Sequence, residues 1–236
     1  KEKEYAEGYA LLIFNKFNRI EAEKISEIYR EQRNRGKGTD YAFEYACLTY
    51  NKMDAKSADK VATIYERQCK LGKKFHYADQ YAMLVVYGVS KEEADKRSET
   101  YQEQHNKGKS VHYAFKYSEL VYRGMDEKEA EKMAKIYEQQ RLMGKEAEYA
   151  DKYVSLMMAG KIRKEAEEIV NIYEEQRRQG KGAYYADMYA NTIYKGWKKD
   201  YVEKLSKIYD DVCNSGKSTY YACEYSMIII RVIDNS

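Results

Sequence analysis

Large and small apolar residues recur along the chain at spacings of three and four, which is the period of an amphipathic helix. The segment from Tyr41 to Thr49 places aromatic rings beside alanines on one helical face, and residues 58–68 carry a second stripe of this kind. Proline, which would interrupt helices, does not occur in the sequence. The pattern therefore predicts an all-α protein.

The pattern repeats with a fixed period of 36 residues. Periods of this length are typical of stacked repeats, in which one helical hairpin cannot bury its apolar face alone. A Tyr-Ala-x-x-Tyr phrase marks each copy, beginning at Tyr5, Tyr41, Tyr77, Tyr113, Tyr149, Tyr185 and Tyr221. We expect a single repeat domain over residues 1–236, with units 5–40, 41–76, 77–112, 113–148, 149–184 and 185–220 and a half-unit 221–236.

Each unit is predicted to contain a first helix of about 12 residues and a second of about 17, joined by tight turns. Glycine recurs where first helices should end, at Gly88, Gly124, Gly160 and Gly196, and second helices at Gly36, Gly72, Gly108, Gly144, Gly180 and Gly216. Capping residues mark the starts of second helices at Asn18, Asp54, Ser90 and Asp126. The predicted fold is an α-solenoid of about six hairpins and a final helix, with a right-handed superhelix.

In unit size, aromatic and small residue packing, and glycine turns, the chain resembles the tetratricopeptide class of helical-hairpin repeats. It also shares its 36-residue period with Sel1-like repeats. The Trp-Leu-Gly-Tyr string and the proline between units of the first family are missing, and so is the Gly-Val-x-x-Asp segment of the second. The resemblance implies an architecture only, and no functional residue is transferred from either family.

Composition narrows the function classes. Apolar residues make up 44% and charged residues 34% of the chain, so it can bury a core. A net charge of +3 is too small to indicate nucleic acid or membrane by itself. The apolar run from Met227 to Ile230 is too short to span a bilayer, so no membrane span is expected.

Localisation is left open by the sequence, although the cytoplasm is favoured. Free thiols fit reducing surroundings. The chain opens with Lys1 instead of Met, so a removed leader and export stay possible. The four cysteines lie at no metal-ligand spacing and are predicted to be buried or half-buried free thiols: Cys47, Cys69, Cys213 and Cys223.

The most uniform polar feature is a lysine directly after each glycine that ends a second helix. Stacked hairpins would set these lysines about 8 to 10 Å apart along one edge. Such a basic edge could hold an acidic protein segment or the phosphates of a single-stranded nucleic acid. The alternative is structural, because cations stabilise the negative end of a helix dipole. The basic-edge residues are Lys37, Lys73, Lys109, Lys145, Lys181 and Lys217.

Positions that vary between units on the first helix form another candidate surface, because hairpin solenoids generally line their concave side with that helix. Acidic residues there could simply occupy a first turn, where negative charge is favourable. Phenylalanines at the same position do not fit that explanation. We therefore predict a partner-binding surface made of Phe43, Asp79, Met83, Phe115, Glu119, Asp151 and Asp187.

Tyrosine is unusually abundant, with 27 copies against five of phenylalanine. A buried phenol needs a partner for its hydroxyl group. The expected partners are glutamines that follow second-helix tyrosines by three residues: Gln32, Gln68, Gln104, Gln140 and Gln176. A tyrosine-lined groove suited to peptide or nucleobase stacking is the functional alternative.

No constellation indicates catalysis. Asp and Glu are plentiful, but they lie on charged helix faces where solvation is the normal environment. His76 and His112 occupy the same place one unit apart, too distant to share a metal or a proton, and the three histidines are predicted to be solvated turn residues: His76, His105 and His112. We expect no enzyme, no cofactor and no metal.

Both ends of the chain are unusually apolar. These residues either close the core as modified caps or contact further segments or another copy of the chain. They are Leu11, Leu12, Ile13, Phe14 and Phe17 at one end, and Ile228, Ile229, Ile230, Val232 and Ile233 at the other.

Taken together, these features predict a non-catalytic binding scaffold that presents a curved helical surface to a protein or peptide. Two alternatives stay open. One is single-stranded nucleic-acid binding along the lysine edge. The other is a structural spacer or self-assembly module with end-to-end self-association.

Overall fold

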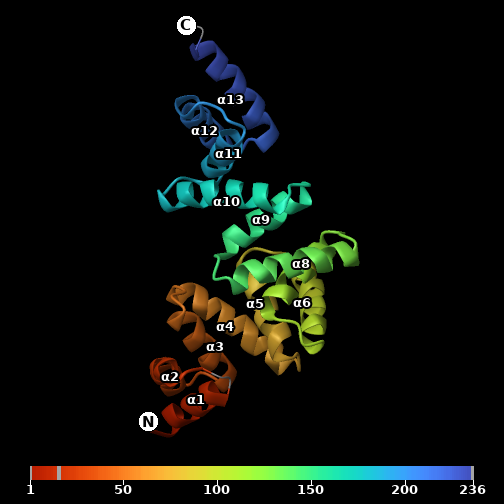
Figure 1. The fold of residues 1–236 in the computed structure, drawn as a ribbon. Coiled ribbons are helices and arrows are strands. Elements are labelled where there is room, and N and C mark those ends of the chain that lie inside the picture. The colour runs from red at the N-terminus through yellow and green to blue at the C-terminus, as the bar shows by residue number, and fades with distance from the viewer. Residues whose placement is uncertain (1, 15–16, 235–236) are drawn as a thin grey trace. The chain divides into compact units, whose positions relative to one another are not determined.

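A computed structural model describes residues 2–14 and 17–234, with side chains for residues 3–14 and 17–230, so the side chains of Val232 and Ile233 lie outside the described part. The described residues form thirteen α-helices and no strand, following one another in tandem (Figure 1). The helices are α1 (Glu2–Phe14), α2 (Arg19–Asn34), α3 (Thr39–Tyr50), α4 (Ala55–Lys70), α5 (Phe75–Val86), α6 (Lys91–Asn106), α7 (Val111–Tyr122), α8 (Glu127–Leu142), α9 (Ala147–Met158), α10 (Arg163–Arg178), α11 (Ala183–Tyr194), α12 (Lys199–Asn214) and α13 (Thr219–Asp234). The predicted all-α solenoid of two-helix repeats is confirmed.

The chain divides into two compact units, Lys1–Ala134 and Lys135–Ser236. In the first, consecutive helices pack in pairs from α1 through α7, and in the second from α9 through α13. Packing between elements adjacent in sequence is what a stacked-repeat protein requires. Whether residues 1–236 behave as one domain stays a prediction.

Each internal first helix uses two faces. Its alanine face packs on the second helix of the preceding repeat, as Ala42 and Ala46 of α3 do against Ile25 and Tyr29 of α2. Its tyrosine face packs on the second helix of its own repeat, as Tyr185 and Tyr189 of α11 do against Val202 of α12. Alanines that are completely buried allow the helices to approach closely, while the rings supply most of the apolar area.

The predicted starts of the second helices are confirmed. The Asn18 side chain accepts a hydrogen bond from the Glu21 amide at 3.0 Å, and the Glu21 carboxylate accepts one from the Asn18 amide at 3.3 Å. Ser90 Oγ accepts in the same way from the Glu93 amide at 3.2 Å. These caps satisfy amides at the helix start that have no intrahelical partner.

The predicted helix ends are also confirmed. Ten glycines adopt positive φ angles at the ends of helices, among them Gly88 at 86° and Gly124 at 84°. Lys52 ends α3 at the corresponding position with φ at 68°, and it is the non-glycine residue with positive φ among those described. A side chain in this left-handed conformation costs about 1–2 kcal/mol, so Lys52 is a strained exception in the repeat.

Candidate binding surfaces

The lysines of the predicted basic edge lie over tyrosine rings. Lys37 Nζ lies 4.3 Å from the centre of the Tyr41 ring, and Lys73 Nζ lies 4.2 Å from that of Tyr77. Among the described residues, five of the six edge lysines make this contact, the others being Lys109, Lys145 and Lys181 at 5.0, 4.3 and 5.1 Å. Each contact is a cation–π interaction worth about 0.5–2 kcal/mol.

The ring beneath each lysine is itself stacked and hydrogen-bonded. Tyr41 stacks on Tyr45 with ring centres 5.8 Å apart and planes at 11°, and every repeat contains a pair of this kind. The Tyr41 hydroxyl donates to Asp59 of α4, and the Tyr77 hydroxyl donates to Asp95 of α6. Burial and this hydrogen bond to a carboxylate raise the pKa of Tyr41, so the phenol stays protonated.

The lysine, the ring and the carboxylate therefore form a repeated structural stack. Lys37 Nζ also lies 3.9 Å from the Asp59 carboxylate, and Lys73 Nζ lies 3.9 Å from Glu99. These lysines are only half exposed, with side-chain exposures of 43% and 40%. A lysine engaged with a ring and near a carboxylate offers less free charge to a phosphate, which favours the structural role of the edge.

The expected glutamine partners of the tyrosines are buried, but the hydroxyl of Tyr173 bonds to a carboxylate instead. Gln32 and Gln176 are 4% and 8% exposed. Tyr173 donates its hydroxyl to Glu148 and not to Gln176, which lies three residues further on. Sequence spacing along one helix misses this pair, because the carboxylate comes from α9 and the phenol from α10.

The seven residues predicted to bind a partner on the first helices are all half-buried. Several of them are engaged with a neighbouring repeat. Glu44 of α3 is 5% exposed and hydrogen-bonds Asp79 of α5, 35 positions later. Burial, followed by the Asp79 charge and this hydrogen bond, raises the pKa of Glu44 well above its ordinary value. A hydrogen bond between two carboxyl groups requires one proton, so Glu44 and Asp79 share a proton between repeats.

The second unit fills the same inter-repeat position with opposite charges. Lys152 of α9 forms an ion pair with Asp187 of α11, also 35 positions later. Asn191 Nδ2 donates to the same Asp187 oxygen at 2.7 Å. Variation at these positions therefore reflects, at least in these two pairs, which side chains meet between repeats. The assignment of this face to a partner stays a prediction.

Two further predicted residues belong to a polar cluster in the first unit. Glu119 accepts a hydrogen bond from Lys116 Nζ at 2.8 Å and pairs with Arg123 at 2.7 Å. Burial of Glu119 opposes ionisation, but the hydrogen bond and charge of Lys116 outweigh it and lower its pKa. The guanidinium of Arg97 lies 5.8 Å from the centre of the Phe115 ring. Met83 packs in the core around Val61 and Tyr65.

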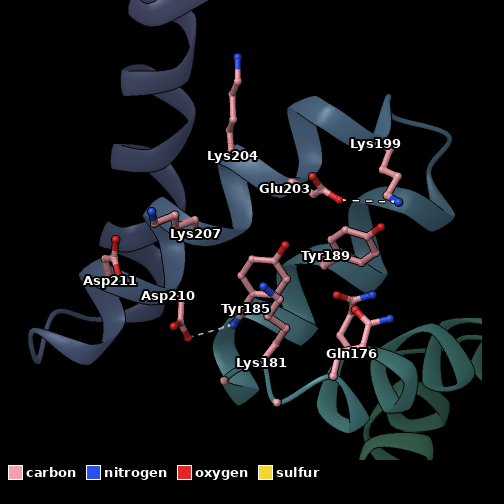
Figure 2. Close-up of a pocket in the computed structure, with 13 residues that line it drawn as sticks. Gln176, Lys181, Tyr185, Tyr189, Lys199, Glu203, Lys204, Lys207, Asp210 and Asp211 are labelled. Carbon is pink, nitrogen blue, oxygen red and sulfur yellow. Dashed lines mark hydrogen bonds and ion pairs between the residues drawn. The ribbon is translucent and has the colours of Figure 1, made fainter.

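One hollow in the described part of the second unit is a groove of about 750 Å³. It lies at the turn between α10 and α11 and is bounded by α12. Figure 2 shows the rings of Tyr185 and Tyr189 inside it, with Glu203 and Lys199 of α12 beside Tyr189. Charged residues dominate the lining: Lys181, Lys199, Lys204, Lys207, Glu203, Asp210 and Asp211.

One wall of this groove is fixed by a hydrogen bond to the start of α11. Gly182, the N-cap of α11, has no side chain with which to cap the helix. The Asp210 carboxylate of α12 accepts from the Tyr185 amide at 3.1 Å instead. A Cβ added at Gly182 would lie 2.7 Å from that carboxylate, so a larger residue at this position would displace the Asp210 side chain. The groove wall formed by Asp210 is therefore held in place.

Residues of the second helix that line the groove differ from unit to unit. Glu203 of α12 corresponds to Asp59, Asp95, Glu131 and Glu167, which are all acidic. Its neighbours one turn to either side are not conserved between units. Lys199 corresponds to Ala55, Lys91, Glu127 and Arg163, and Lys207 corresponds to Thr63, Glu99, Lys135 and Asn171. A position that is acidic in every unit compared is thus flanked by two positions whose residue type and charge change from repeat to repeat.

The histidine prediction is wrong in one respect. The rings of His76 and His105 lie against each other with their centres 3.4 Å apart and their planes tilted by 31°, and Phe75 contacts His76 edge-on. Burial, followed by the nearby His105, lowers the pKa of His76. The pair joins the start of α5 to the end of α6. Separation by 29 positions hides it in the sequence, although the antiparallel hairpin brings those two helix ends together.

The cysteines are free, with Cys213 buried and the other three half-buried, as expected. Burial and the charges of Glu44 and Asp79 raise the pKa of Cys47 to about 12. Within residues 3–14 and 17–230, no group of three or more His, Cys, Asp or Glu side chains could hold a metal ion. No helix in the described part of the chain is long and apolar enough to cross a membrane.

No protein-family model matches this chain, and no curated protein matches it either.

Proposed function

We propose that this chain is a non-catalytic scaffold that binds a segment of another protein, and that the groove of the second unit is one binding site. The observation that carries the proposal is the groove itself. It combines a volume of about 750 Å³ with two aromatic rings and unit-specific charged residues. A groove of this size can hold several residues of a peptide.

The arrangement of each repeat supports the proposal, because the residues that pack the helices together are constant between units and the residues that line the groove vary. The tyrosine pair, the alanines and the acidic position of the second helix recur in every unit and hold the helices together. The residues that flank the acidic position differ between units, and two of them also contact the stack: Glu99 lies 3.9 Å from Lys73, and Asn171 accepts a hydrogen bond from the Tyr149 hydroxyl. Repeat scaffolds typically carry recognition on positions of this kind.

The lining also indicates the chemistry of the segment. Two of the carboxylates already have partners, because Asp210 accepts from the Tyr185 amide and Glu203 lies 3.8 Å from Lys199. Lys204 and Lys207 lie on the α12 side of the groove. A peptide with an acidic side chain could pair with Lys207, while an apolar side chain contacts the small part of Tyr185 and Tyr189 that lines the groove.

A peptide-display selection tests this proposal. The probe is a library of random peptides, and binding of the selected sequences is measured by fluorescence anisotropy. We expect enrichment of acidic and apolar residues, and at least a tenfold loss of affinity in Lys207→Glu, because one charge contact at a peptide interface contributes about 1.4 kcal/mol or more. Lys164→Glu, on the exposed start of α10 outside the groove, is the matched control.

The result that contradicts the proposal is equally clear. Selected peptides that bind Lys207→Glu and the original chain equally would exclude the groove. If Phe43→Ala and Asp79→Ala then weaken binding, the first-helix face would be the site instead. Binding of a single-stranded oligonucleotide with steep salt dependence, lost when Lys73 and Lys109 are neutralised, would support the lysine edge.

A further inference from the structure

A second hollow of the second unit, of about 200 Å³, is lined by α11, α12 and α13. We call it the Trp197 hollow, after the residue that lines it from the turn between α11 and α12. None of its lining residues belongs to the peptide groove. The two hollows are therefore different candidate sites.

The Trp197 hollow lies where two repeats meet without a strong polar contact. At the preceding junction, Lys152 of α9 forms an ion pair with Asp187 of α11, 35 positions later. The corresponding residues of α11 and α13 are Met188 and Cys223, and both line the hollow. A thioether and a thiol are only weak hydrogen-bonding groups, so this pair cannot bridge the junction as the ion pair does.

The hollow does not arise from the end of the sequence. Cys223 and Met227, which line it from α13, are half-buried. Their counterparts 36 positions earlier, Asp187 and Asn191 of the internal helix α11, are half-buried as well. This part of α13 is therefore covered to the same degree as the same part of an internal helix.

The accessible apolar lining suits an aromatic ring. Met188, Trp197 and Met227 are half-buried, so each leaves part of its side chain exposed to the hollow or to solvent. Aromatic rings stack on tryptophan, and methionine sulfur makes favourable contacts with them. An apolar cavity of about 150 Å³ is enough to hold benzene, so a hollow of about 200 Å³ has room for a single substituted ring.

The charged lining suits a carboxylate. The charge of Asp187 is offset by Lys152, and Asn191 Nδ2 donates to the same carboxylate at 2.7 Å. Lys195 at the end of α11 is exposed and forms no ion pair with a residue that the structure describes. The uncompensated charge at this hollow is therefore positive, and a negative group on the ligand complements it.

From these observations we propose that the Trp197 hollow binds a small aromatic carboxylate. The ring lies between Met188, Trp197 and Met227, and the carboxylate pairs with Lys195. This site is independent of the peptide groove, and it would give the scaffold a small-molecule ligand.

The test titrates phenylacetate into the full chain and follows the fluorescence of Trp197, the single tryptophan. Saturation-transfer nuclear magnetic resonance on phenylacetate gives a readout that does not depend on the tryptophan. We expect saturable binding with a dissociation constant of about 1 mM or tighter, as is usual for a ligand of this size. Benzyl alcohol and benzylamine, which lack the negative charge, should bind more weakly.

Three variants locate the site. Lys195→Gln should weaken phenylacetate binding about threefold to fivefold and leave benzyl alcohol binding unchanged, because it removes one exposed ion pair. Lys198→Gln, at an exposed position outside the hollow, is the matched control and should bind like the original chain. Cys223→Leu partly fills the hollow and should abolish binding of both ligands, with unchanged helicity in circular dichroism. Lys207→Glu should bind phenylacetate normally, which separates this test from that of the groove.

Four results would overturn the inference. Absence of saturable phenylacetate binding by both methods would mean that the hollow is not a site for this ligand class. Equal binding to Lys195→Gln and the original chain would mean that the carboxylate does not pair with this lysine. Normal binding to folded Cys223→Leu would place the ligand elsewhere. Tighter binding of benzylamine than of phenylacetate would show that the hollow prefers a cation.

Discussion

Replacing Glu44 with glutamine should remove a loss of stability that the first unit suffers as the pH rises. The structure buries this carboxyl between repeats and raises its pKa by desolvation, by the Asp79 charge and by their hydrogen bond. Other titratable groups act on the same cluster, namely Cys47 on α3, Tyr65 and Cys69 on α4, and Tyr101 on α6. The prediction concerns Glu44, since it is the more buried of the two carboxylic acids.

The sign follows from proton binding. In the unfolded chain Glu44 loses its proton near its ordinary pKa of about 4.5, while the folded chain keeps it to a higher pH. The folded state therefore binds more protons in this window, and rising pH favours unfolding. The contribution is complete below pH 4.5 and is lost as the pH rises toward the folded pKa. The slope for one proton is about 1.4 kcal/mol per pH unit.

Glu44→Gln keeps the shape and the hydrogen-bond donor but cannot ionise. We expect its free energy of unfolding, relative to the original chain, to increase as the pH rises above about 4.5 toward the folded pKa, by up to about 1.4 kcal/mol per pH unit. Urea unfolding followed by circular dichroism gives the free energies. Trp197, the single tryptophan of the chain, lies in the second unit, and its fluorescence provides an internal reference.

Glu103→Gln, at an exposed site on α6, is the matched control and should leave the pH profile unchanged. Glu44→Lys extends the test, because it copies the Lys152–Asp187 ion pair of the second unit. It should stabilise the first unit at pH 8 relative to the original chain. Identical pH profiles for Glu44→Gln and the original chain would refute the reasoning, because Glu44 would then not titrate in the expected window.

Three further predictions concern single positions. Lys52→Gly should raise the free energy of unfolding by about 1 kcal/mol in urea titrations, because glycine adopts the positive φ of 68° without steric cost; a loss of stability would contradict this. Gly182→Ala should lower it by about 1–3 kcal/mol, because the added Cβ displaces the Asp210 carboxylate and leaves the α11 start uncapped; an unchanged value would mean that the cap is dispensable. Finally, the lowered pKa of His76 means that its stabilising contribution is present above about pH 6.5 and is lost as the pH falls through the folded pKa. His76→Phe should therefore lose less stability on acidification below pH 6.5 than the original chain, with nuclear magnetic resonance titration of His105 as the check on the remaining ring.

Features that depend on residues within a single helix or turn could be predicted from the sequence. The caps at Asn18 and Ser90 and the glycine ends at Gly88 and Gly124 depend on residues three to five positions apart, so spacing alone locates them. The position of Lys37 over Tyr41 could also have been predicted, because the two residues are four apart at the start of a helix.

Contacts between helices could not be predicted in this way. Glu44 meets Asp79 and Lys152 meets Asp187 at a separation of 35, which follows from the stacking register and not from either helix. His76 and His105 meet because the α5–α6 hairpin is antiparallel. The period of 36 was visible, but the offset of one residue between facing positions required the structure.

The sequence did not locate the groove of the second unit. Abundant tyrosine suggested a tyrosine-lined surface, whereas variable first-helix positions suggested a different location. The groove instead involves Lys199 and Lys207 of the second helix. Comparing the units at these positions shows variation around a constant acidic residue, and that signal was available in the sequence.

Excision of one whole repeat tests most directly the claim that each repeat packs only on its neighbours. Deleting residues 77–112, one whole period, removes α6 and all of α5 after His76, and joins His76 to Tyr113 so that α7 follows α4 with the same alanine and tyrosine faces in contact. The account predicts that the shortened chain keeps its helicity per residue in circular dichroism and unfolds cooperatively in urea. A shortened chain that loses helicity throughout, or aggregates without a cooperative transition, would show that distant parts of the chain hold the fold together.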